Sequence, residues 1–181
     1  QIISALFGYG SFTENSVLNS SNALYYFGLG LPAFAFIKVF STFFFANHDT
    51  KTPFYISLVS VLLNILISVY FFKDIGFIII PIATTISSWF NSIILFIFLK
   101  NNDFFSFNKI FLKKFVKIVF ASITMGIFFQ YLILFFENQL SYSYSFKAVY
   151  LVLCVLFTII FYFALSYFIK AFNYQDIKLK Y

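Results

Sequence analysis

The residues with the clearest binding chemistry in this sequence are polar side chains placed inside long apolar runs. Lys38 lies within such a run, and two hydroxyl side chains, Ser41 and Thr42, follow it closely. An ionisable residue in this setting usually faces a protein interior or a water-filled cavity. The alternative is that its long side chain extends to the nearer membrane surface or pairs within the protein. Lys38, Ser41 and Thr42 are therefore candidate cavity residues, whose ammonium and hydroxyl groups match an anionic ligand.

Two asparagines lie on polar stripes in two further apolar runs. The members of each stripe recur every three or four residues, which places them on one face of a helix. Such a stripe either lines a polar cavity or joins helices through hydrogen bonds between small side chains. Both interpretations stay open, and Asn64 and Asn91 are the candidate cavity residues. The stripes comprise Ser57, Ser60, Asn64 and Ser68, and Thr84, Ser88, Asn91 and Ser92.

A proline follows two glycines in the run that contains Lys38. Pro32 cannot donate the helical hydrogen bond to the carbonyl of Gly28, so a kink is expected there. Bent or broken helices often mark binding sites in membrane proteins, but a static kink can also simply improve packing. Gly28, Gly30 and Pro32 are therefore hinge candidates.

The sequence offers no catalytic set. The six acidic residues all lie near the ends of apolar runs or between them, so no two form a buried acid–base pair. There is no phosphate-binding loop, zinc-protease motif or Ser-His-Asp set. The single histidine, His48, lacks the spaced partners of a metal site, and one cysteine, Cys154, permits no disulfide within the chain. We expect neither an enzyme nor a bound metal or cofactor.

Long apolar helices must position these polar groups. Of the 181 residues, 62% are hydrophobic and 10% are charged, whereas a soluble domain carries about 25% charged residues. Backbone groups in lipid must be satisfied within their own segment, and the apolar runs do not alternate as barrel strands do. We therefore predict an all-α, polytopic bundle of about five transmembrane helices. The expected spans are residues 23–46 (entered near residue 14), 53–72, 77–99, 115–136 and 148–169.

Short polar connections separate these spans, and the first has a distinctive sequence. It contains Asp49-Thr50-Lys51-Thr52-Pro53. We expect Thr52 to cap the following helix, with Pro53 at its first position. Asp49 is expected to accept hydrogen bonds from neighbouring turn amides.

Lysines are distributed unevenly between the two sides of the predicted bundle. All twelve basic residues are lysine; Lys38 lies within a span, nine lie on one side, and Lys73 and Lys147 lie on the other. Lysine-rich connections stay on the cytoplasmic side, which predicts a cytoplasmic C-terminus. Lysines flanking helices do not form the basic stripe of a nucleic-acid-binding protein, so no nucleic acid partner is expected.

The polar stripes also suggest a division of the chain, because the last two spans carry only thin ones. We predict cavity-lining helices over residues 1–100, a cytoplasmic basic loop over 101–114, two peripheral helices over 115–170 and a cytoplasmic tail over 171–181. The first residues, QIISALF, are expected to end a helix that begins upstream. The chain is therefore interpreted as a C-terminal fragment.

Three segments resemble motifs of the MurJ (MviN) lipid II flippases. They are ALFGYGSFT at residues 5–13, GLGLPAFAFIKVF at 28–40 and FFANHDTKTP at 44–53. The DTKTP turn also recurs in the wider multidrug/oligosaccharide-lipid/polysaccharide exporter superfamily. Their order and spacing together favour the MurJ family, and the resemblance is sharpest over residues 5–53.

This resemblance implies the last five helices of a fourteen-helix transporter of the bacterial inner membrane. The implied activity is movement of a lipid-linked peptidoglycan precursor, an anionic substrate that Lys38 would match. The implied partners are this substrate, membrane lipids and the missing N-terminal lobe. The family's functional arginines lie upstream, and this chain contains no arginine.

Two other functions remain open at this point. The chain could belong to an exporter of another lipid-linked saccharide or a drug, which the upstream lobe would reveal by its cavity arginines. It could also be a non-transporting membrane scaffold whose polar stripes serve packing alone. Solvent accessibility of cysteines placed at Asn64 and Asn91 would separate a scaffold from a transporter.

Overall fold

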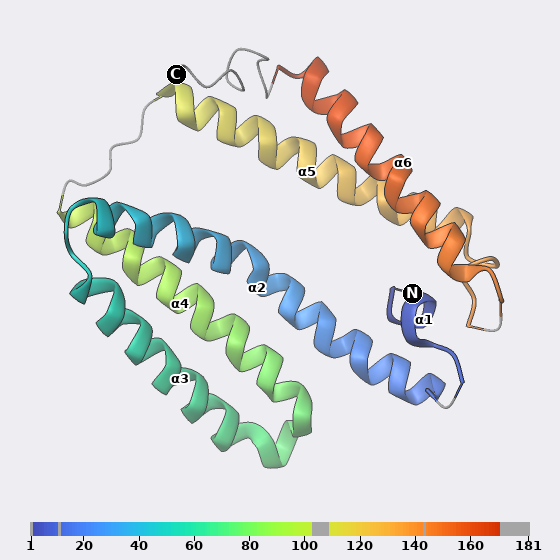
Figure 1. Ribbon diagram of the computed structural model, residues 1–181, viewed down its shortest axis with the longest axis horizontal. Coiled ribbons are helices and arrows are strands. Elements are labelled where there is room, and N and C mark those ends of the chain that lie inside the picture. Colours follow the sequence, from blue (N-terminus) through green and yellow to red (C-terminus); the bar gives the residue numbers. More distant parts are fainter. Residues whose placement is uncertain (1, 11, 103–108, 143, 171–181) are drawn as a thin grey trace. The chain divides into compact units, whose positions relative to one another are not determined.

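The computed structural model describes residues 2–10, 12–102, 109–142 and 144–170 (Figure 1). Every regular element among them is a helix, so the predicted all-α class is confirmed. Each of the five predicted spans corresponds to one long helix. The elements are α1 (Ile2–Phe7), α2 (Glu14–Ala46), α3 (Lys51–Ile75), η1 (Gly76–Ile78), α4 (Ile79–Asn101), α5 (Lys109–Phe135) and α6 (Lys147–Phe168).

Four helical stretches of the described chain are long and apolar enough to cross a membrane. One of them, Lys51–Asn101, has 51 residues and contains both α3 and α4. It turns back at Gly76, whose φ of 74° and ψ of −154° lie in a region that only glycine adopts readily. The two halves, of 25 and 23 residues, lie side by side (Figure 1). Each is long enough for one crossing.

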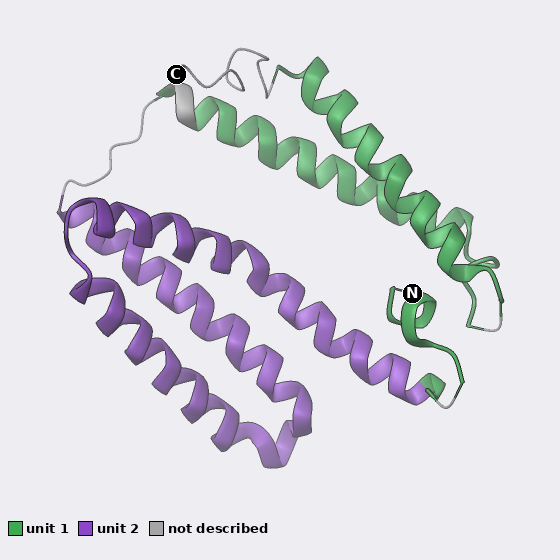
Figure 2. Ribbon diagram, viewed as in Figure 1, with its two compact units in different colours: residues 1–14, 107–181 green, residues 15–106 purple. Residues whose placement is uncertain are grey.

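The helices form two compact units (Figure 2). The three-helix unit, residues 15–106, contains α2, α3 and α4. The hairpin unit, residues 1–14 and 107–181, contains α1, α5 and α6. The predicted division into cavity helices, a basic loop, peripheral helices and a tail stays a prediction, and its tail lies outside the described residues.

The three-helix unit has a small apolar core near the turn between α2 and α3. Phe44 of α2, Ile56 of α3 and Leu95 of α4 are buried against one another. Further along the helices, Ala33 and Ala83 are completely buried. Small residues at such contacts let helix backbones approach closely, which is how helices pack without a hydrophobic driving force in lipid.

In the hairpin unit α5 and α6 lie side by side. Phe128 and Phe161 stack between them, with ring centroids 4.2 Å apart. The short helix α1 packs on the hairpin through a cluster of Ala5, Leu140 and Leu151. The first residues of the chain are thus held by residues far along the sequence.

The turn from α2 to α3 corrects one prediction and confirms another. The side-chain carboxylate of Asp49 accepts hydrogen bonds from the backbone N–H groups of Lys51, at 3.1 Å, and Thr52, at 3.0 Å, as expected. The prediction that Thr52 caps α3 is wrong: the helix begins at Lys51, and Thr50 at the cap position makes no side-chain cap. A carboxylate accepts more strongly than a hydroxyl, so Asp49 fills that role.

The charge of Asp49 is stabilised by the same turn. The Thr52 side chain, its backbone N–H and Lys51 together hold the pKa of the Asp49 carboxyl below its usual value, and the hydrogen bond from the Thr52 side chain is the largest cause. His48, just before it, has a positive φ of 59°. That conformation ends α2, because it lets the Asp49 N–H reach the Phe44 carbonyl at 3.0 Å.

Candidate functional site

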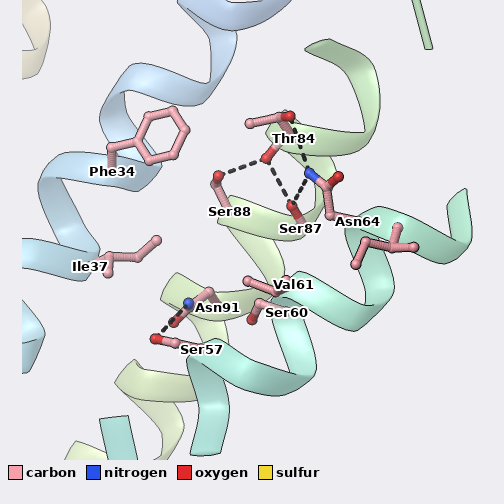
Figure 3. A pocket seen from close by; sticks show the side chains of 11 residues that line it. Phe34, Ile37, Ser57, Ser60, Val61, Asn64, Thr84, Ser87, Ser88 and Asn91 are labelled. Atoms are coloured by element: carbon pink, nitrogen blue, oxygen red, sulfur yellow. Dashed lines mark hydrogen bonds between the residues drawn. The ribbon is translucent and has the colours of Figure 1, made fainter. Parts of the chain in front are cut away.

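A groove of about 270 Å³ lies among the helices of the three-helix unit (Figure 3). Hydroxyl and amide side chains from α3 and α4 form its polar side, and apolar side chains of α2 lie across from them. The predicted polar stripes of the second and third spans therefore face each other. Its lining consists of Phe34, Ile37, Ser57, Ser60, Val61, Asn64, Ile65, Thr84, Ser87, Ser88 and Asn91.

Asn64 joins α3 to α4. Its amide nitrogen donates to the hydroxyls of Thr84, at 3.1 Å, and Ser87, at 3.3 Å. Its amide oxygen accepts from the Ser68 hydroxyl at 3.4 Å. Both polar atoms of this side chain are therefore occupied within the protein, which favours a packing role for Asn64.

Asn91 differs from Asn64 in having one polar atom left over. Its side chain is only 7% exposed, and its amide nitrogen lies 3.4 Å from the Ser57 hydroxyl. Its amide oxygen is buried and has no hydrogen-bond partner among the described residues. If the oxygen and nitrogen of the Asn91 side-chain amide exchange places, the nitrogen is left without a partner instead. Buried polar atoms are nearly always paired, so the Asn91 oxygen stands out in the groove lining as lacking a partner among the described residues.

The candidate residues of α2 lie outside this groove. Lys38 is exposed and directly follows Ile37, the last groove residue of α2. Ser41 is half-buried, and Thr42 is exposed and donates to the Val39 carbonyl of its own helix at 2.6 Å. The structure thus brings Asn64 and Asn91 together and leaves Lys38, Ser41 and Thr42 about one turn further along.

Two side chains of α4 bond to the backbone of α2 close to Pro32. Thr85 donates to the carbonyl of Tyr26 at 2.6 Å, and the Trp89 indole donates to the carbonyl of Leu29 at 3.0 Å. The helix α2 runs through Pro32 without ending. The polar side chains of α4 therefore hold the very stretch of α2 in which proline weakens the helical hydrogen bonds.

The two glycines of this stretch have different surroundings. A methyl group added to Gly30 would lie 3.1 Å from the Thr85 hydroxyl, whereas one added to Gly28 would meet nothing within 4 Å. The close approach of α4 therefore depends on a glycine at position 30 but not on a glycine at position 28. The role of Gly28, Gly30 and Pro32 as a hinge stays a prediction.

Comparison with known protein families decides the identity of this bundle. The family model described as "Lipid II flippase MurJ" matches residues 1–153, which is most of the chain. The chain belongs to the lipid II flippase MurJ family. The resemblance seen in the three sequence segments is thereby confirmed.

Individual relatives of this MurJ-family chain come from diverse bacteria. It is 31% identical over 138 residues to a probable lipid II flippase MurJ of Buchnera aphidicola, a match that covers 76% of this chain and 26% of the relative. It is 36% identical over 90 residues to the corresponding protein of Rickettsia prowazekii, covering 50% of this chain and 18% of the relative. It is 35% identical over 126 residues to the corresponding protein of Thermotoga maritima, covering 70% of this chain and 25% of the relative. The chain thus spans between 18% and 26% of the length of these relatives.

The sequence missed three polar groups of this MurJ-family unit. Thr85 and Trp89 bond to α2, and Ser87 lines the groove. The indole N–H of Trp89 was the available signal, because a polar N–H within an apolar membrane helix needs an acceptor in the protein. Ser87 and Thr85 each stand next to a stripe residue, so helical spacing alone did not include them.

The structure places Lys147 differently from the sequence interpretation. The sequence interpretation placed it in a polar loop, but it is the first residue of α6 and only 1% exposed. The assignment of nine lysines to one side, and of Lys73 and Lys147 to the other, stays a prediction. Within the described residues no group of three or more His, Cys, Asp or Glu side chains could hold a metal ion.

Proposed function

We propose that this chain supplies the C-terminal membrane helices of a transporter that moves lipid II, the lipid-linked peptidoglycan precursor, across the bacterial inner membrane. The family match over residues 1–153 carries this proposal. Four apolar helical stretches of the described chain and a polar groove among α2, α3 and α4 support it. The chain covers 26% and 18% of the length of two relatives, so its proposed partner in transport is the remainder of the same protein.

Within this function the groove would provide a polar path inside the membrane. The unpaired amide oxygen of Asn91 would accept a hydrogen bond from water or from a polar group of the substrate. Asn64 would hold α3 against α4 beside this path. No acid–base or covalent step is assigned to any residue, in keeping with a transporter rather than an enzyme.

Lys38 would supply the positive charge for an anionic substrate. It is exposed, and no partner for it exists among the described residues. An ammonium in a membrane-length helix costs roughly 3 kcal/mol on insertion scales unless water or a counter-charge offsets it. A diphosphate-linked lipid would bring such a charge.

Depletion of the full-length protein tests the proposal. The outward appearance of lipid II should stop, and lipid II should accumulate inside, as measured with an enzyme that cleaves it only from the outer surface. A plasmid copy of the full-length gene should restore export. Unchanged lipid II export after depletion, with another saccharide lipid retained inside, would favour an exporter of that lipid.

The proposed orientation places the 47–52 turn and the C-terminus in the cytoplasm. The lysine asymmetry supports it, since Lys73 is the one exposed lysine assigned to the outer side. Reporter fusions after Asp74 and after Asp103 should report opposite compartments. Equal signals would contradict this orientation.

A further inference from the structure

The hairpin unit contains a buried cation that the proposed transport function does not use. Lys147, the first residue of α6, is 1% exposed. Its ammonium donates to two backbone carbonyls, those of Gly8 and Tyr142, each at 2.8 Å. Gly8 lies just after α1 and Tyr142 in the connection between α5 and α6. One side chain therefore ties together two connections that are far apart in the sequence.

Two aromatic rings complete the enclosure. The Lys147 nitrogen lies 4.4 Å from the ring centroid of Tyr9 and 4.6 Å from that of Tyr142, both within cation–π range. The Tyr142 hydroxyl also donates to the Phe12 carbonyl at 2.8 Å. The residues Gly8, Tyr9, Tyr142 and Lys147 are called the lysine cage below.

Glycine is required at one wall of the lysine cage. A methyl group on Gly8 would lie 3.0 Å from the Tyr142 ring and 3.2 Å from the Lys147 nitrogen, and 2.5 Å from the Ser4 carbonyl. The backbone of the first connection can approach the ammonium only because this side chain is absent. The close packing of the lysine cage therefore depends on glycine at position 8.

The energetics of the lysine cage make it easy to open. Its partners among the described residues are all neutral, so the cost of removing the ammonium from water is offset only by carbonyls and ring faces. A positive charge at a helix N-terminus also opposes the helix dipole. Because Lys147 stands at the end of α6, water can solvate its ammonium once the first connection moves away.

We propose that the lysine cage is a releasable latch, which holds the connection before α2 against the start of α6 and opens in the native protein. The chain passes from the hairpin unit to the three-helix unit between Glu14 and Asn15, just after the latched residues. The latch thus determines whether the segment that enters α2 is held or free. This inference does not depend on what the protein transports.

The latch can be tested by acylating lysines of the purified full-length protein with a water-soluble amine reagent. Mass spectrometry would compare Lys147 with Lys73, which is exposed at the end of α3. We expect Lys147 to react at least tenfold more slowly than Lys73, yet to reach full labelling while the protein keeps its melting temperature. Labelling as fast as Lys73 would show that no cage exists, and labelling only after unfolding would show a static contact.

Substitutions of Tyr9 test whether its aromatic ring protects the Lys147 ammonium. Tyr9→Leu removes one ring and should speed the labelling of Lys147 at least fivefold, whereas Tyr9→Phe keeps the ring and should leave the rate unchanged. Tyr144→Leu is the matched control, because Tyr144 lies in the same connection as Tyr142 but contacts Phe146 and Tyr150 instead. Equal rates in Tyr9→Leu and the unsubstituted protein would overturn the proposal.

Discussion

The two units of this MurJ-family chain differ in the kind of polar side chain that each buries. In the three-helix unit the buried groups are uncharged, lie midway along helices and leave the Asn91 oxygen without a partner. In the hairpin unit a charged group, Lys147, lies at a helix end and is enclosed on every side that the described residues show. The Asn91 oxygen lies in a groove lining and lacks a partner among the described residues, whereas the Lys147 ammonium is bonded within its own unit. The hairpin unit, over the part that the structure describes, also contains unpaired buried oxygens, those of Ser4, Gln139 and Ser166.

Lys38 and Lys147 show a second difference between the two units. Lys38 of the three-helix unit is exposed and has no partner among the described residues. Lys147 of the hairpin unit is buried, and its ammonium contacts two backbone carbonyls and two aromatic rings of Gly8, Tyr9 and Tyr142. The ammonium of Lys38 is thus exposed, whereas that of Lys147 is enclosed within its unit.

The largest expected effect would break the three-helix unit at the contact of α2 with α4. Gly30→Leu forces a side chain against Thr85, and overpacking of this kind costs about 1–3 kcal/mol. We expect a clear loss of melting temperature and of protein in the membrane. Gly28→Leu is the matched control, since a side chain there meets nothing within 4 Å. A Gly28→Leu protein that is stable but cannot transport would instead support the hinge.

The next effect concerns the exposed lysine of the three-helix unit, Lys38. Lys38→Gln should lower lipid II export about tenfold, a loss of about 1.4 kcal/mol of substrate stabilisation, while Lys38→Arg should largely keep it. Expression must be matched, and export can be followed with the outer-surface cleavage assay. Normal export by Lys38→Gln would show that this lysine reaches the membrane surface or serves packing.

A loss of stability is also expected where α3 turns back into α4. Gly76→Ala places a side chain in a glycine-only backbone region and should destabilise the three-helix unit by about 1–3 kcal/mol. Gly126→Ala in α5 is the control in the other unit, because its added methyl meets nothing within 4 Å and alanine favours a helix by about 1 kcal/mol over glycine. Thermal unfolding should therefore shift in opposite directions, and equal shifts would contradict the assigned roles.

The smallest effect is a pH dependence at the Asp49 turn. The folded-state pKa of Asp49 lies below its ordinary value of 3.8. Its charged form thus stabilises the fold above that value, and this contribution is lost as the pH falls through the lower folded pKa. Asp49→Asn should remove this part of the acid sensitivity of the melting temperature. An unchanged acid profile in the variant would show that the turn bonds contribute no stability.

Hydropathy and helical spacing predicted much of this structure. The five long helices and the facing stripes around Asn64 and Asn91 followed from the sequence, because both depend on residues within one helix. The roles of Gly28 and Gly30 did not follow, since only the approach of Thr85 distinguishes them. Lys147 was misjudged for the same reason: its partner Gly8 lies 139 residues away.

The central claim is that the groove of the three-helix unit is open to water and to a polar guest. It can be tested in the full-length protein after Cys154 and any cysteine in the rest of the protein are replaced by alanine, by measuring how fast single introduced cysteines react with a water-soluble thiol reagent in intact membranes. Asn91→Cys, inside the groove, should react at least tenfold faster than Ile93→Cys, which lies on the same helix outside the groove lining and is 51% exposed. An Asn91→Cys protein that still transports but reacts no faster than Ile93→Cys would show that the polar stripes serve packing alone.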